Sequence, residues 1–239
     1  MQPQKVPVTQ LFNAPYQYQI PVFQRGYVWT LEKQVVPLWA DVADRANALM
    51  ERRTLSSGPG TQALRPLPKH FLGSIVLAPL TNSFGRVGAY EVIDGQQRST
   101  TLHLLLLALR HATQQLGTSP LPQMLDVLVR NPGPYPNHPD DYHKVWPTQA
   151  GRQEMRILDE AESAEAVCQA YPVKVEKNVD GKKKEEKVER PLMIQAYLYL
   201  YHACLAYLRD IDLADPVNVA RERTFSDGLV SATRTANVV

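Results

Sequence analysis

The sequence has few cysteines and no strong excess of charge. Its only two cysteines, Cys168 and Cys204, lie in unrelated segments of the 239-residue chain. Two isolated thiols exclude a disulfide framework, and the lack of a CxxC pair argues against a zinc site, so we expect a reducing cytoplasm. The net charge of +2 provides no general attraction to nucleic acid, so any DNA contact would need a local patch.

Long apolar runs are also missing. Residues 102–109 are too few for a membrane span of roughly 20 residues, and residues 192–208 are interrupted by Tyr, His and Gln. The N-terminal MQPQKVPVTQLF lacks a basic stretch followed by an apolar run, so we predict no signal peptide. We therefore expect a cytosolic protein with no membrane contact. The 44% of hydrophobic residues is enough for one large domain, or two small ones, with a sizeable core.

The N-terminal half alternates between strand-like and helical patterns. Pro21 biases Ile20 toward extended geometry, so YQYQIPVFQRGYVW reads as a strand entering a loop. A helix should begin near Thr30, with Pro37 close to its start. A secure Leu-rich helix is expected at 99–115, with Ser99 or Thr100 as its N-cap. The other elements expected here are an extended stretch at 8–12, a mobile loop at 54–69, and the strands HFLGSIVLAP and YEVI.

The C-terminal half is less regular. Residues 117–147 are Pro-rich, with one short helix expected at 123–130, and further helices are expected at 152–159, 163–171, 192–209 and 216–229. The stretch KVEKNVDGKKKEEKVERP is nearly free of apolar residues, which predicts a disordered or hairpin-like insertion. The final ATRTANVV looks like the first residues of a strand. We divide the chain into a core (1–115), its extension (116–173), a charged insertion (174–190) and a helical segment (191–239).

The turn Asp94-Gly95-Gln96-Gln97-Arg98 stands between a strand and the N-terminus of a helix. Gly95 permits a tight turn or a close approach of the backbone, and the free N–H groups of the helix suit an anion such as phosphate. Arg98 can add a bidentate contact, while Asp94 could hold a metal ion or orient a water. Alternatively, Ser99 caps the helix and the glutamines satisfy buried backbone groups.

A second cluster, IPVFQRGYVW at 20–29, places an amide, a guanidinium and three aromatic rings within a few residues. Arginine and aromatic faces can hold a base or nucleotide ring by stacking and cation–π contact. Alternatively, Tyr27 and Trp29 anchor the loop to the core, and Arg25 pairs with a carboxylate.

Other candidate sites are weaker. The six histidines show no metal-ligand spacing and read as surface or satisfied core residues, with His103 packed in the Leu-rich helix. The lysines at 182–184 read as a solvated face, because the acidic residues that follow them cancel much of their field. Neither a P-loop, a GxGxxG turn nor an HNH-type nuclease cluster is present.

Taken together, IPVFQRGYVW, HFLGSIVL and YEVIDGQQRSTTLHLLLLAL resemble the DGQQR family found at the N-terminus of GmrSD-type restriction enzymes, with SspE-like and BrxU-like members. KVWPTQAGRQEM resembles a further family block, KVWPT.ADR, with Gly151 in place of the usual aspartate, which leaves the contacts of this block open. The resemblance covers most of residues 8–160. It implies an α+β fold of the ParB/sulfiredoxin-like superfamily, with a small mixed sheet, flanking helices and a mainly helical C-terminal part.

The resemblance also implies a function. In such proteins the DGQQR domain binds and hydrolyses nucleoside triphosphates, and a separate HNH domain cuts DNA. Transferred to this sequence, Asp94, Gln96, Gln97 and Arg98 would be catalytic. Magnesium would accompany the ATP or GTP, with Asp94 as a possible ligand. Nucleotide or phosphate binding would fall to Gln24, Arg25, Gly95, Ser99 and Thr100, and sensing of modified DNA to Phe23, Gln24 and Tyr27.

The family domain continues into an ETLN.RG block and a nuclease, which this sequence lacks, so we expect a truncated or split product that does not itself cut DNA. The first hypothesis is an NTP-binding, hydrolysing sensor of an anti-phage, modification-dependent restriction system, acting with DNA and an HNH nuclease. The second is a non-catalytic ParB-like module that recognises modified DNA or its phosphate backbone. A third is an interaction subunit with a vestigial pocket.

Overall fold

The computed structural model describes residues 4–56, 70–81, 83–117, 120–133, 135, 137–179, 182–209 and 236–238. Two expected features, the loop at 54–69 for the most part and the helix at 216–229, lie outside these residues.

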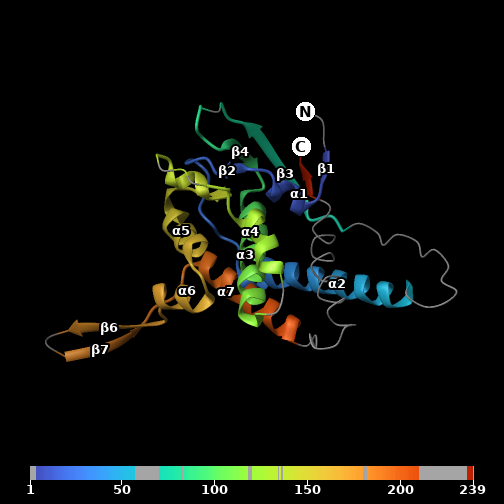
Figure 1. Cartoon of the computed structure of the whole chain (residues 1–239). Helices are drawn as coiled ribbons and strands as arrows, with labels where there is room; N and C mark the ends of the chain where they lie inside the picture. Colours follow the sequence, from blue (N-terminus) through green and yellow to red (C-terminus); the bar gives the residue numbers. More distant parts are fainter. Residues whose placement is uncertain are drawn as a thin grey trace.

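A mixed sheet forms one layer of the molecule (Figure 1). Its strand order is β1-β8-β3-β4-β2-β5. The central pair β3–β4 is antiparallel, whereas β2 runs parallel to both β4 and β5. At the other edge β8 pairs parallel with β3 and antiparallel with β1. The bounds are Gln4–Val6 (β1), Tyr16–Gln19 (β2), Gly73–Pro79 (β3), Gly88–Asp94 (β4), Val145–Trp146 (β5) and Ala236–Val238 (β8).

Helices α2, α3 and α7 lie on one side of this sheet, and the β6–β7 hairpin projects away from them (Figure 1). The predicted α+β fold, a mixed sheet with flanking helices, is confirmed. The helices are α1 (Val8–Asn13), α2 (Val36–Ser56), α3 (Gln96–Leu116), α4 (Leu121–Val129), α5 (Arg152–Glu160), α6 (Ala164–Ala170) and α7 (Leu192–Arg209). A π-helical turn at Leu31–Val35 precedes α2, short 3-10 turns lie at Pro139–Tyr142 and Gln149–Gly151, and the hairpin pairs Lys174–Val179 (β6) with Lys182–Lys187 (β7).

Helix α3 is the centre of the core. It contacts α7, α4, β3 and β5, and nearly every side chain from Ser99 to Thr113 is buried. Each leucine buried in this way contributes about 2 kcal/mol of hydrophobic free energy. A helix apolar on all sides can be stable only if it is enclosed, which is what the Leu-rich pattern predicted.

Two predictions about helices are wrong. The stretch at 8–12 forms helix α1 rather than an extended segment, because Val8, Leu11 and Phe12 have helical spacing and all three are buried. Helix α3 begins at Gln96, so neither Ser99 nor Thr100 is its N-cap; that position belongs to Gly95. The Ser99 hydroxyl instead donates to the carbonyl of Gln96, within the helix.

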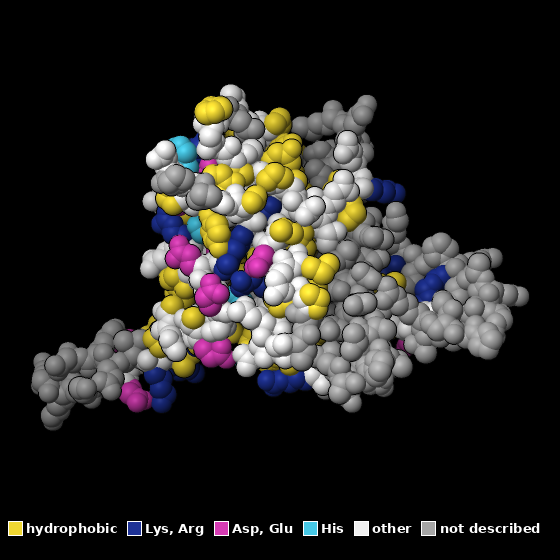
Figure 2. All heavy atoms as spheres, viewed as in Figure 1, with side chains coloured by type: hydrophobic (Ala, Val, Ile, Leu, Met, Phe, Trp, Pro, Cys, Tyr) yellow, Lys and Arg dark blue, Asp and Glu magenta, His cyan; other side chains and the backbone are white. Residues whose placement is uncertain are grey.

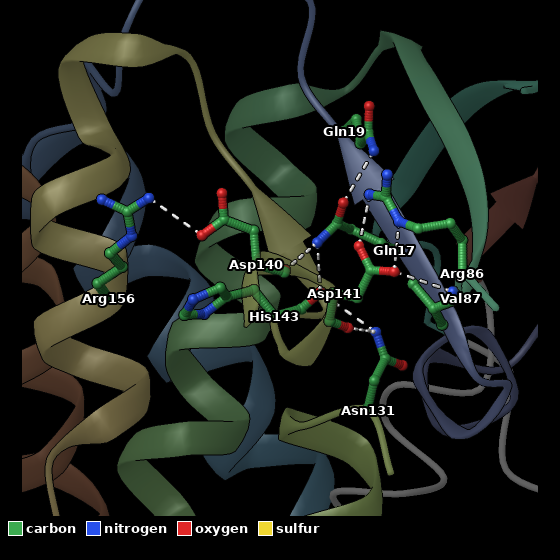
Figure 3. A network of polar contacts seen from close by, with 9 residues as sticks. All are labelled: Gln17, Gln19, Arg86, Val87, Asn131, Asp140, Asp141, His143 and Arg156. Atoms are coloured by element: carbon green, nitrogen blue, oxygen red, sulfur yellow. Dashed lines mark hydrogen bonds and ion pairs between the residues drawn. The ribbon is translucent and has the colours of Figure 1, made fainter. Parts of the chain in front are cut away.

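A polar network fastens β2 to the segment before β5 (Figure 3). Arg86 donates two hydrogen bonds, of 2.6 and 2.7 Å, to the fully buried carboxylate of Asp141. Burial alone would raise the pKa of Asp141, but the hydrogen bonds from Arg86 and from the Val87 amide, together with nearby positive charge, outweigh it and the pKa is lowered. Gln17 and Asn131 donate to backbone carbonyls of the same segment. The carbonyl and carboxylate acceptors that this irregular segment buries are therefore satisfied by side chains.

A second buried carboxylate, Asp159 of α5, lies between two histidines. His103 Nε2 is 2.8 Å from Oδ1, and His143 Nδ1 is 2.6 Å from Oδ2. Asp159 and His103 are completely buried. Burial would raise the pKa of Asp159, but the charge and hydrogen bonds of the histidines prevail and lower it. The prediction that His103 is a buried core residue with a hydrogen-bond partner is confirmed for its Nε2, which contacts Asp159.

Lys144 is fully buried beside β5, where its ammonium group donates to the carbonyl of Ala14 at 2.6 Å. Burial lowers the pKa of Lys144 to about 8. Between this value and the pKa of about 10.4 in the unfolded chain, the unfolded state holds a proton that the folded state has released. The free energy of unfolding should therefore rise with pH across this window.

We expect Lys144→Met to remove this rise. Between pH 7.5 and 9.5, the wild-type chain should gain about 1–2 kcal/mol relative to the variant in denaturant unfolding. Because the two chains are compared at each pH, contributions from the buried tyrosines and Cys204 cancel. A parallel pH dependence in both chains would contradict this assignment.

Candidate functional site

The site begins at the turn from β4 into α3, and Gly95 determines its shape. Gly95 has φ +89°, in the left-handed region that favours glycine. A Cβ placed there would lie 3.0 Å from the carbonyl oxygen of Ser74 and 3.2 Å from Cα of Ile75. The turn therefore needs glycine for both its conformation and its close approach to β3, as predicted.

The first backbone amides of α3 have no intrahelical acceptor and no side-chain cap. The first intrahelical hydrogen bond runs from the amide of Ser99 to the carbonyl of Gly95, so the amides of the three preceding residues lie before the helical ladder. Among the described residues no side chain caps the N-terminus of α3, and the first turn of α3 contains no acidic residue. The unpaired amides and the helix dipole create a positive potential beside the exposed carboxylate of Asp94.

Gln97 fastens the loop at 20–30 to α3. Its side chain is buried; Oε1 accepts from the amide of Val28 at 2.8 Å and Nε2 donates to the carbonyl of Gly26 at 2.9 Å. Tyr27 adds a hydroxyl contact of 2.8 Å to Thr101, and burial raises the pKa of Tyr27 to about 12 although the Thr101 hydrogen bond opposes this. Gln97 and Tyr27 thus have the structural roles considered as alternatives.

Gln96 faces the same loop but at its exposed side. Its Nε2 donates to Oε1 of Gln24 at 3.2 Å, and Gln24 Nε2 lies 3.4 Å from the carbonyl of Ile93. Next to Gln24, Phe23 is 78% exposed, and Arg25 is also exposed. Within the described residues no carboxylate forms an ion pair with Arg25. The two sequence motifs therefore meet in space through the part-buried contact of Gln96 with Gln24, beside the exposed side chains of Phe23 and Arg25.

Arg98 points away from that contact, toward β3. Its Nη1 donates to the carbonyl of Ser74, and its guanidinium lies against Gly73. Gly73 has φ +104°, and a Cβ there would be 2.4 Å from Arg98 Nε. Gly73 therefore makes the space that Arg98 occupies. Sequence reasoning missed this residue, although a lone glycine in a strand pattern signals close approach of another group.

A pocket of about 210 Å³ opens beside Arg98. Trp29, at the end of the loop, and Leu102, one turn along α3, contribute to its wall. Its polar lining includes Asp41 of α2 and His70, neither of which any sequence pattern had distinguished. The remaining lining residues are Gln34, Pro37, Leu38, Phe71 and Leu72. The pocket thus joins the loop motif and the DGQQR helix to α2.

Two other predicted phosphate ligands lie inside α3. Ser99 and Thr100 are each 2% exposed, so they are not part of the surface that the open helix end presents. Within the described residues no three His, Cys, Asp or Glu side chains are gathered closely enough to hold a metal ion.

The KVWPTQAGRQEM block includes the edge strand β5 and continues into the first turn of α5. Gly151, in place of the expected aspartate, is the N-cap of α5 and offers no side-chain hydrogen bond. A Cβ at Gly151 would lie 3.2 Å from Met193 Cε. The guanidiniums of Arg152 and Arg156 lie over the ring of Trp146, whose ring also stacks with His143 at 4.6 Å. The described contacts of this block are therefore packing contacts, of Gly151 with Met193 and of the two arginines and His143 with Trp146.

The chain matches the GmrSD restriction endonuclease N-terminal domain family over residues 8–228. It belongs to that family, the N-terminal domains of modification-dependent restriction endonucleases. No curated protein matches the sequence significantly. Among the described helices, none combines the length and apolar character needed to cross a bilayer.

Proposed function

We propose that this domain binds a nucleoside triphosphate at the start of α3 and hydrolyses it, as the sensor of a modification-dependent restriction system. The observation that carries the proposal is the position of Arg98. Arg98 belongs to the first turn of a helix whose N-terminus has no side-chain cap, its guanidinium lies against Gly73 of β3, and it lines a pocket. A cationic side chain and uncapped N-terminal amides on the same helical turn are the kinds of donor that phosphate recognition uses.

The residues of the motif take different roles in this proposal. Arg98 neutralises phosphate charge, and Gly95 lets the phosphate approach the backbone. Gln96, at the surface, contacts a phosphate oxygen or the attacking water. Arg25, exposed on the adjacent loop, supplies a second cation, and Gln97 positions that loop.

Asp94 fits a magnesium ion brought by the nucleotide. Magnesium in such sites usually keeps several waters and takes one or two carboxylates together with phosphate oxygens, so one exposed carboxylate beside the helix end is compatible. When bound, the ion would neutralise charge on the phosphates. Asp94 would hold it, or a bound water, next to the open amides of α3.

Replacing Arg98 should separate nucleotide binding from folding. Arg98→Ala removes a charged donor, so its affinity for a non-hydrolysable ATP or GTP analogue should fall by about 10- to 100-fold. Hydrolysis should fall at least as much. Arg156→Ala, which removes an exposed arginine of α5, should leave both unchanged. Unaltered binding in a folded Arg98→Ala variant would refute the assignment.

A second function, recognition of modified DNA, is supported by the loop tip. Val22 and Phe23 are 73% and 78% exposed beside Gln24 and Arg25, which brings apolar, amide and cationic groups together. On the face seen in Figure 2, basic and acidic side chains are interspersed, so this tip would have to supply the DNA contact locally. In this proposal DNA and an HNH nuclease domain or subunit are the partners.

A further inference from the structure

The pocket beside Arg98 has the size of one part of a nucleotide. Its volume of about 210 Å³ is below the range of roughly 300–1,000 Å³ typical of pockets that enclose a whole drug-sized ligand. Trp29 and Phe71 supply aromatic rings, and Leu38 and Leu102 supply aliphatic surface. Such a lining suits a flat heterocycle and would desolvate a triphosphate at high cost.

The charged groups fix which end of the ligand enters. Arg98 lines the pocket and also belongs to the first turn of α3, so this one residue links the pocket to that turn. Phosphates held at the amides of α3 and at Arg98 would leave the base directed toward Trp29. Helix α2 also lines the pocket and contributes Asp41 to it.

Asp41 and His70 are the polar groups suited to read the edge of that base. Asp41 Oδ2 and His70 Nε2 are 3.4 Å apart, longer than an ordinary hydrogen bond. Their side chains are 55% and 38% exposed, so both retain hydrogen-bonding capacity toward a ligand. A carboxylate only accepts, whereas an imidazole can donate or accept, and bases differ in the donors and acceptors on their edges.

We propose that Asp41 and His70 are specificity-determining residues that select the nucleobase, while Arg98 and the N-terminus of α3 bind the phosphates. This inference rests on the proposed nucleotide-binding function and adds to it the division of the ligand between the two parts of the site. A base that leaves the Asp41 carboxylate unpaired should bind more weakly than one that donates to it.

The test compares ATP, GTP, CTP and UTP with inorganic tripolyphosphate, which has no base, all with magnesium and the full chain. In the wild-type chain the four nucleotides should differ in Kd by about tenfold or more. Asp41→Asn should compress that spread to within about threefold, and His70→Gln should shift the order of preference. The Kd for tripolyphosphate should change less than twofold in either variant. A twofold change corresponds to about 0.4 kcal/mol of binding free energy.

Asp44→Asn is the matched control, because Asp44 is an exposed aspartate of the same helix that does not line the pocket. It should keep the wild-type spread. Three results would overturn the inference on base selection but leave the proposed function standing. These are an unchanged spread of Kd values in Asp41→Asn, an equal loss of affinity for tripolyphosphate in that variant, and equal binding of all four nucleotides by the wild type. If the wild-type chain binds neither nucleotides nor tripolyphosphate, the proposed function fails and the inference fails with it.

Discussion

Asp159→Asn is expected to lower the free energy of unfolding by about 3–5 kcal/mol, because it removes a completely buried carboxylate that contacts two buried histidine rings. The carboxylate accepts from His103 at 2.8 Å and from His143 at 2.6 Å, and an amide cannot accept from both. Denaturant unfolding at pH 7 measures the loss. Asp140→Asn, which breaks the half-exposed pair with Arg156, should cost at most about 1 kcal/mol.

Asp159→Asn should also change how the free energy of unfolding depends on pH in acid. Because the pKa of Asp159 is lowered in the folded state, its contribution is present above the unfolded pKa of about 3.9 and is lost as pH falls through the folded pKa. The variant has no such group to protonate, so its deficit should shrink below about pH 4. A deficit under 1 kcal/mol at pH 7, or one independent of pH, would show that the histidines do not depend on this carboxylate.

Gly95→Ala is expected to destabilise the fold by about 3 kcal/mol and to abolish nucleotide binding. Forcing φ of +89° on alanine costs roughly 1–2 kcal/mol, and a Cβ 3.0 Å from the Ser74 carbonyl adds a clash with backbone that cannot rotate away. The start of α3 must shift to relieve the clash, and the amides that we propose bind phosphate shift with it.

Gly117→Ala separates the two causes. Gly117 ends the same helix with φ +71°, but nothing lies within 4 Å of a Cβ built there. It should therefore show only the conformational cost of roughly 1–2 kcal/mol, and it should leave nucleotide binding intact. Equal losses of stability and binding in the two variants would mean that the approach of Gly95 to β3 does not shape the site.

Long periodic elements could be predicted from the sequence because their patterns are local. Helix α7 has the predicted bounds at 192–209, and the charged insertion forms the hairpin that was one of two expected outcomes. The stretch at 8–12 was misassigned because five residues are too few to separate the strand and helix periods. The start of α3 was misplaced because glycine in the left-handed conformation, not a hydroxyl side chain, ends the preceding strand.

The contents of the site could be predicted better than its geometry. The DGQQR turn and the loop motif both proved to lie at one place, joined by Gln96 and Gln24. The position of Arg98 against Gly73 depends on strand β3, whose Ser74 lies 24 residues earlier in the sequence. The contribution of Asp41 to the pocket wall depends on how α2 packs. Such long-range placements leave no mark in local periodicity. The same holds for the two histidines around Asp159.

The most direct test of the nucleotide-binding proposal is calorimetric titration of the wild-type chain and Arg98→Ala with a non-hydrolysable triphosphate and magnesium. The account predicts saturable binding by the wild type and a loss of about 10- to 100-fold in the variant, with both chains equally folded by circular dichroism. Heats that are absent from the wild type, or identical in the two chains, would contradict it and favour the loop tip as a DNA-recognition surface.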